Sequence, residues 1–250
     1  MLEIKTDALI SFDPMLGLAV GAIFIGGLSR GFAGFGAALI IVPALTLVYG
    51  PVPAVVIMSL IEVPGVLQLA RTAVRDADWK NLAPLCFAAA VTIPIGAWAL
   101  AVLDVTLIRQ SIAGIVIVFG AMIVTGWRYN GEVTTGLSAA IGTVSGFCSG
   151  IASLGGPPVV MFLIAQGSNA SQTRAGIIAY FAFATGLRLA IFAIFGLLSV
   201  DALFLSLLLS PVYMCGIWVG KRNFRGISET VFRRFVVALV LVMGMIALIN

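Results

Sequence analysis

Histidine is absent from the chain, and charged residues make up only 10% of its 250 positions. The sequence also lacks paired acids at metal-ligand spacing and a serine–lysine dyad inside an apolar segment, so it offers no acid–base or nucleophilic machinery. The three cysteines, Cys86, Cys148 and Cys215, are odd in number and scattered, which excludes a disulfide framework and a metal-binding spacing. We therefore expect no enzymatic activity, no cofactor and no metal.

The scarcity of charge also excludes a soluble protein. Apolar residues make up 61% of the chain, and the mean hydropathy is +1.17. So few charged residues could not cover the surface of a soluble globule. The net charge of +4 does not indicate nucleic acid, because the basic residues cluster in short loops beside apolar segments. We predict an all-α polytopic membrane protein in a lipid bilayer, with one membrane domain over residues 1–250.

The chain contains an internal repeat. Its two halves match at an offset of about 120 residues, which places Gly96 and Trp98 opposite Gly216 and Trp218. Each half has five apolar segments, and the first two of each half are shorter than the about 20 residues of a membrane-spanning helix. They lie at about 14–29, 36–49, 52–72, 80–103 and 106–127, and at about 134–150, 157–167, 173–197, 201–220 and 230–249.

We predict repeats over about 14–128 and about 133–250. Each repeat opens with a glycine-rich broken or re-entrant helix hairpin, followed by three transmembrane helices. The short opening segments favour hairpins of half-helices over two full crossings. The total number of crossings stays open.

Loop charges predict that the two repeats are inverted. The loop at 71–80 is basic, and its counterpart at 197–202 is acidic. The loop at 103–107 holds Asp104, with Arg109 just beyond it, and its counterpart at 221–225 is basic. Equivalent loops therefore lie on opposite sides of the membrane. Placing the basic loops in the cytoplasm predicts a multi-pass protein of the cell membrane with both termini outside the cytoplasm.

Each repeat contains a glycine-rich interruption of its first apolar run. Residues 31–36 read Gly-Phe-Ala-Gly-Phe-Gly, and residues 150–158 read Gly-Ile-Ala-Ser-Leu-Gly-Gly-Pro-Pro. A break followed by a new helix presents free N–H groups and a positive dipole end, which favours an anion. The alternative is that these glycines only allow close helix packing. The anion interpretation predicts a substrate site that includes Gly34, Gly36, Ser153, Gly155 and Gly156.

Ionisable residues also lie at membrane depth. Arg30 stands at the first break, Glu62 inside segment 52–72 and Arg188 inside segment 173–197, opposite Gln68 of the first repeat. Such residues usually face a transport pathway or a charged partner. Because arginine binds oxyanions with paired hydrogen bonds, we predict that Arg30, Gln68 and Arg188 contact substrate. Glu62 is a proton-coupling candidate, since burial favours its neutral form; a buried ion pair with an arginine is the equally open alternative.

These motifs resemble the TauE/SafE family of membrane proteins, which is associated with export of sulfite and organosulfonates. The resemblance covers nearly the whole chain. The family motif stands here as Gly34-Phe35-Gly36-Ala37-Ala38, with Pro43 downstream, and as Leu154-Gly155-Gly156-Pro157-Pro158. The first copy departs from the family pattern, because Ala37 and Ala38 replace further glycines. The resemblance implies a small anion as substrate.

The leading hypothesis is a secondary transporter that exports a small oxyanion, such as sulfite or an organosulfonate, by alternating access of the two repeats. The cytoplasm-negative membrane potential favours exit of an anion. Proton coupling through Glu62 is left open, as is assembly into a homo-oligomer. The alternatives are an anion channel, which also uses helix breaks and dipoles, and a non-transporting membrane subunit of a larger complex.

Overall fold

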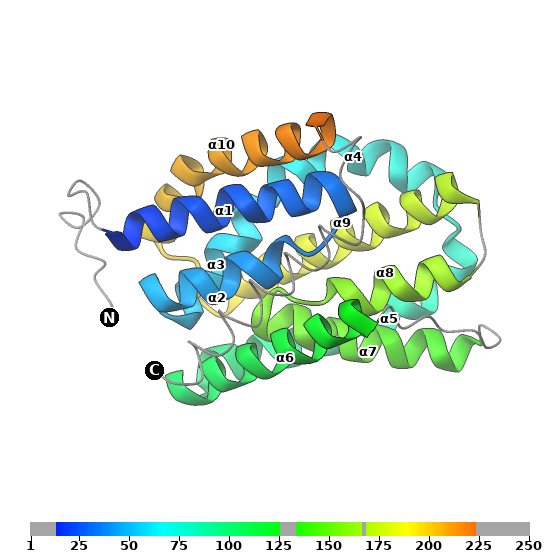
Figure 1. Cartoon of the computed structure of the whole chain (residues 1–250). Helices are drawn as coiled ribbons and strands as arrows, with labels where there is room; N and C mark the ends of the chain where they lie inside the picture. Colours follow the sequence, from blue (N-terminus) through cyan, green and yellow to red (C-terminus); the bar gives the residue numbers. More distant parts are fainter. Residues whose placement is uncertain (1–13, 126–133, 167–168, 224–250) are drawn as a thin grey trace.

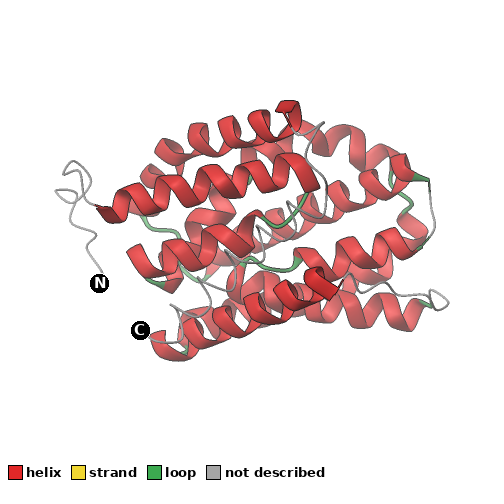
Figure 2. Cartoon of the chain, viewed as in Figure 1, coloured by secondary structure: helices red, strands yellow, loops and turns green. Residues whose placement is uncertain are grey.

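The computed structural model describes residues 14–125, 134–166 and 169–223, and every regular element within them is an α-helix (Figure 2). The first half contains α1 (Pro14–Ala33), α2 (Ala37–Tyr49), α3 (Pro51–Ile61), α4 (Val63–Asp76), α5 (Trp79–Val102) and α6 (Val105–Thr125). The second half contains α7 (Thr135–Ala152), α8 (Gly156–Ala165), α9 (Ala170–Ile194) and α10 (Val200–Asn223). The segment predicted at about 230–249 lies outside the described residues.

Six helices of the described part are long and apolar enough to cross a membrane, namely α1, α5, α6, α7, α9 and α10. Helices α2 and α8 have only 13 and 10 residues, too few to cross alone. Phe87, Ile194 and Leu207 are about three-quarters exposed (75%, 74% and 75%), which suits a surface that faces lipid. The prediction of an all-α multi-pass membrane protein is confirmed.

Three of the predicted segments differ from the helices of the structure. The segment at 52–72 is divided into α3 and α4 at Glu62, because Pro64 lacks the backbone N–H that a continuous helix requires. Helices α1 and α7 have 20 and 18 residues and run past the predicted ends at 29 and 150. A glycine inside a packed helix does not end it. The chain leaves the helix only near Gly34 and Ser153, whose φ angles are +79° and +58°.

The helix ends gather at two opposite ends of the bundle (Figure 1). The turns between α2 and α3, between α5 and α6, and between α9 and α10 lie at the end where α1 begins. The turn between α4 and α5, the start of α7, the end of α8 and the start of α9 lie at the other end. The turns from α1 to α2 and from α7 to α8 lie instead in the interior of the bundle. The interior therefore contains two helix starts.

Capping differs between the ends and the interior of the bundle. At the ends, α5, α7 and α9 begin with Asp78, Thr134 and Asn169, whose side chains accept hydrogen bonds from backbone N–H groups of the first turn. In the interior, α2 and α8 begin at Gly36 and Gly155, and no side chain of the described residues caps either helix. The interior helix starts therefore differ from those at the bundle ends in having no side-chain acceptor for their first N–H groups.

Close glycine contacts fix the helices that carry the two interior turns. Helix α1 packs mainly on α10, and α7 mainly on α5. A Cβ atom at Gly27 of α1 would lie 3.1 Å from the Cα atom of Gly216, and one at Gly150 of α7 would lie 3.0 Å from the carbonyl carbon of Gly96. Backbone atoms cannot move aside as a flexible side chain can, so both crossings require glycine.

Replacing Gly150 tests this packing. We expect Gly150→Ala to destabilise the protein by about 1–3 kcal/mol, because the added methyl group meets the backbone of α5. The matched control is Gly114→Ala in α6, where no described atom lies within 4 Å of the added Cβ. The midpoint of thermal unfolding in detergent measures both variants. Equal midpoints for the two variants would contradict the close α5–α7 contact.

Candidate functional site

A buried cluster of three charged side chains joins both halves of the chain. The Nη1 group of Arg30 in α1 donates to Oε1 of Glu62 at 2.5 Å. The Nη2 group of Arg188 in α9 donates to Oε2 of the same carboxylate at 3.1 Å. Glu62 therefore uses one oxygen for each arginine, and the second arginine comes from the other half of the sequence.

The break between α3 and α4 positions Glu62. The Glu62 N–H donates to the carbonyl of Met58 at 3.3 Å, and its carbonyl accepts from the N–H of Val66 at 3.0 Å. Pro64 donates no hydrogen bond in the next turn, so the helix axis is interrupted where the carboxylate projects. The break thus presents one acid at the level of the two arginines.

The charged side chains of this cluster are largely shielded from solvent. The side chains of Glu62 and Arg188 are 6% and 3% exposed, and that of Arg30 is 16% exposed. Arg188 also donates through Nη1 to the Ser149 hydroxyl at 2.7 Å, whereas its Nε has no partner among the described residues. The Arg30 guanidinium lies 5.1 Å from the centre of the Phe181 ring, a cation–π contact. Two cations thus share one anion in a largely dry environment.

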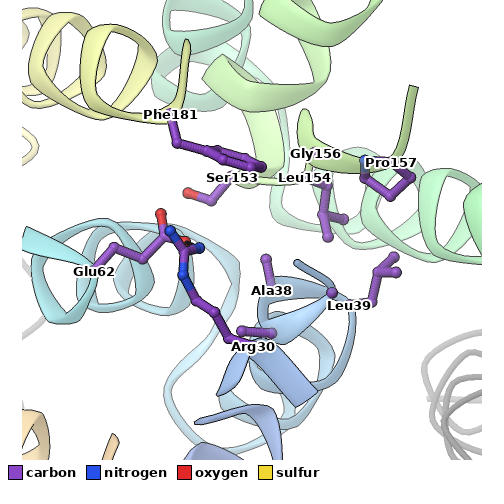
Figure 3. A pocket seen from close by; sticks show the side chains of 11 residues that line it. Arg30, Ala38, Leu39, Glu62, Ser153, Leu154, Gly156, Pro157 and Phe181 are labelled. Carbon is purple, nitrogen blue, oxygen red and sulfur yellow. Dashed lines mark hydrogen bonds and ion pairs between the residues drawn. The ribbon is translucent and has the colours of Figure 1, made fainter. Parts of the chain in front are cut away.

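A small cavity lies against this cluster, between the two interior turns (Figure 3). It encloses about 280 Å³ of empty space, part of it open to solvent. Its lining comes from the start of α2, the start of α8 with the turn before it, and three side chains of other helices. These residues are Gly36, Ala37, Ala38, Leu39, Ser153, Leu154, Gly156, Pro157, Arg30, Glu62 and Phe181. The two breaks seen in the sequence thus lie beside one cavity in the structure.

Serine hydroxyl groups hold the second turn in place. Ser153 has a positive φ angle, which is strained for a residue with a side chain. Its Oγ lies 2.9 Å from the Oγ of Ser59 and donates to the carbonyl of Val55 at 3.2 Å. On the other side of the turn, the Ser145 hydroxyl donates to the Gly155 carbonyl and lies 2.7 Å from the Tyr180 hydroxyl. These contacts keep the start of α8 directed at the cavity.

The structure brings most of the predicted site residues together. Arg30, Gly36, Ser153, Gly156 and Glu62 line the cavity. Arg188 reaches Glu62 from α9 but does not line the cavity.

The remaining predicted residues lie nearby or are undescribed. Gly34 provides the positive φ of the first turn, and Gly155 begins α8 and accepts the Ser145 hydrogen bond. Gln68 belongs to α4, and its side chain lies outside the described part of the chain.

Several cavity residues were missed by the sequence interpretation. Phe181 and Leu39 are apolar residues inside apolar runs, and nothing in their spacing separates them from lipid-facing or core positions. Ser59 and Tyr180, which support the second turn, gave no signal either. Ala37 and Ala38 could have been found, because they directly follow the first break.

The cavity favours a small anion. Two arginines and one carboxylate leave one unbalanced positive charge, and the start of α2, which has no side-chain cap, faces the same space. The cavity is too small for a drug-sized molecule. No group of three or more potential metal ligands occurs among the described residues.

Charge balance predicts unequal effects of removing cluster members. Glu62→Gln leaves two buried cations without an anion, and we expect it to destabilise the empty protein by about 3–5 kcal/mol. Arg188→Gln leaves the balanced Arg30–Glu62 pair, and we expect a smaller loss. Thermal unfolding in detergent without added oxyanion measures both, with Asp201→Asn at the start of α10 as control. A larger loss for Arg188→Gln would contradict this charge balance.

The comparisons with known proteins identify the family of the chain. The model of the family described as "Sulfite exporter TauE/SafE" matches residues 19–246, nearly the whole chain. Neither the search of curated proteins nor the search of solved structures gave a match. The family match, together with the membrane-length helices, makes the protein a multi-pass membrane protein of a transporter family. The chain belongs to the TauE/SafE sulfite exporter family.

Proposed function

We propose that the protein is a secondary transporter that exports a small sulfur oxyanion, such as sulfite or an organosulfonate. The observation that carries this proposal is the Arg30–Glu62–Arg188 cluster beside a cavity between two uncapped helix starts. Arginine and backbone N–H groups are the donors that bind oxyanions best. The family match supports a sulfur oxyanion among the small anions that would fit.

The transport site lies between two inverted repeats of about 14–128 and about 133–250, which form one membrane domain. The turns at Gly34 and Ser153, which match in the sequence, both have positive φ angles. Gly96 of α5 and Gly216 of α10 also match, and each packs against the opening helix of the other repeat. The hairpin of α1 and α2 extends into the interior from one end of the bundle, and the hairpin of α7 and α8 extends into it from the other end (Figure 1). These features support an inverted pair of hairpins.

Alternating access would act on the contacts that join the two repeats at the cavity. The Glu62–Arg188 ion pair and the Ser59–Ser153 hydroxyl contact each link one residue of the first repeat to one of the second. A rocking motion of one repeat against the other would open these contacts on one side of the site at a time. The substrate would then bind to the arginine side chains, which are paired with Glu62 when no substrate is present.

The orientation follows from the charges at the two ends of the bundle. Arg75, Lys80 and Arg174 lie in α4, α5 and α9 at one end, and Asp104 and Asp201 lie near the turns at the other. Placing the basic end in the cytoplasm of the cell puts the start of the chain outside. The membrane potential then favours exit of an anion by about 2.3 kcal/mol per charge per 100 mV.

Glu62 remains the proton-coupling candidate within this proposal. Its carboxylate contacts both arginines and lines the cavity. A proton carried by Glu62 would therefore pass through the same site as the anion.

Flux measurements in liposomes test the transport proposal. We expect saturable sulfite flux and counter-transport, and Arg188→Gln should weaken apparent affinity about 10- to 100-fold, because the cluster loses its net positive charge. Arg188→Lys keeps the charge and should retain most of the affinity. Asp201→Asn is the control for removal of a charge away from the site.

Three outcomes would contradict the proposal. Flux that does not saturate would indicate a channel, and no flux of any oxyanion would indicate a non-transporting subunit. Unchanged affinity in Arg188→Gln would remove this arginine from the site.

A further inference from the structure

We propose that the site selects monoanions over dianions because Glu62 is a built-in counter-charge that cancels one of the two arginines. This inference rests on the proposed function and specifies the charge of its substrate. It applies to sulfonates, and to sulfite in its hydrogensulfite form.

The charge count is the first step. Arg30 and Arg188 both contact Glu62, and the other acids of the described residues lie at helix ends, at Asp76, Asp78, Asp104 and Asp201. The cluster therefore carries one net positive charge. An unbalanced charge is unfavourable at membrane depth, and a bound monoanion cancels it. A dianion would replace one excess positive charge with one excess negative charge.

The helix dipoles do not alter this count. The starts of α2 and α8 each place a partial positive charge at the cavity. The ends of α1 and α7, at Ala33 and Ala152, stand only a few residues earlier in the same two turns and bring partial negative charges of similar size. In α8, Pro157 and Pro158 also remove two of the first N–H donors. The ionised side chains therefore set the net charge.

The geometry gives Glu62 a direct role in selection. Its carboxylate lines the cavity next to Arg30, as Figure 3 shows, so any bound anion lies beside a fixed negative charge. Arg30 also lines the cavity and is the more exposed of the two arginines, which makes it the direct donor to the anion. Arg188 lies behind Glu62 and contributes through its charge. A second negative charge on the ligand would face the carboxylate without a second free cation.

Methanesulfonate and sulfate provide the matched probes, since both are small tetrahedral oxyanions that differ by one charge. Their affinities for the purified wild-type protein in detergent are measured by calorimetric titration at fixed pH and constant ionic strength. We expect methanesulfonate to bind at least about tenfold more tightly. Sulfate binding that is equal or tighter would overturn the inference while leaving an anion transporter in place. Binding of neither probe would contradict both the inference and the proposed function.

Removing the counter-charge provides the second arm. Glu62→Gln gives the cluster two net positive charges, and its preference should shift toward sulfate by about tenfold or more. Asp201→Asn removes the same charge far from the cavity and should leave the preference unchanged. An unchanged preference in folded Glu62→Gln would overturn the inference. Size-exclusion chromatography shows whether Glu62→Gln is folded. If it is not, Glu62→Asp, which keeps the charge, replaces it and must still prefer methanesulfonate. The comparison of the two probes on the wild-type protein then decides the question.

Discussion

Helix ends cannot face lipid, and this constraint organises the whole structure. The starts of α2 and α8 leave backbone N–H groups without side-chain caps among the described residues, in the interior of the bundle. Such groups are tolerated at membrane depth only where protein or a polar cavity encloses them. The close pairs α1–α10 and α5–α7 supply that enclosure. The cavity between the two breaks is thus a consequence of how the chain must bury its interrupted helices.

The charged cluster obeys a related constraint, because buried charges also need partners. Arg188 is almost completely buried, and its charge is tolerable only with Glu62 at 3.1 Å and the Ser149 hydroxyl at 2.7 Å. Glu62 stands between α3 and α4, two residues before Pro64. One carboxylate between two guanidinium groups leaves one net positive charge. The Glu62–Arg188 ion pair also links the two halves, so in the proposed mechanism anion binding and conformational change would act on the same contacts.

Much of this arrangement could be predicted from the sequence, because it depends on strong local signals. The glycine-rich turns at 31–36 and 150–158 and the isolated charges of Arg30, Glu62 and Arg188 stand out in an apolar chain. Exact helix ends could not be predicted, since a glycine inside a helix and a glycine that ends one look alike. Phe181 could not be predicted either. Its position over Arg30 depends on tertiary packing, which no spacing of apolar residues reveals.

We propose that the two hairpins enter the membrane from opposite sides and meet at the arginine cluster. Labelling with a membrane-impermeant maleimide in intact cells tests this arrangement, with single cysteines at positions 80 and 201 in a variant without Cys86, Cys148 and Cys215. We expect the cysteine replacing Asp201 to react from outside and the one replacing Lys80 to react only after the membrane is opened. Reaction of both positions from the same side would show that the hairpins are not inverted.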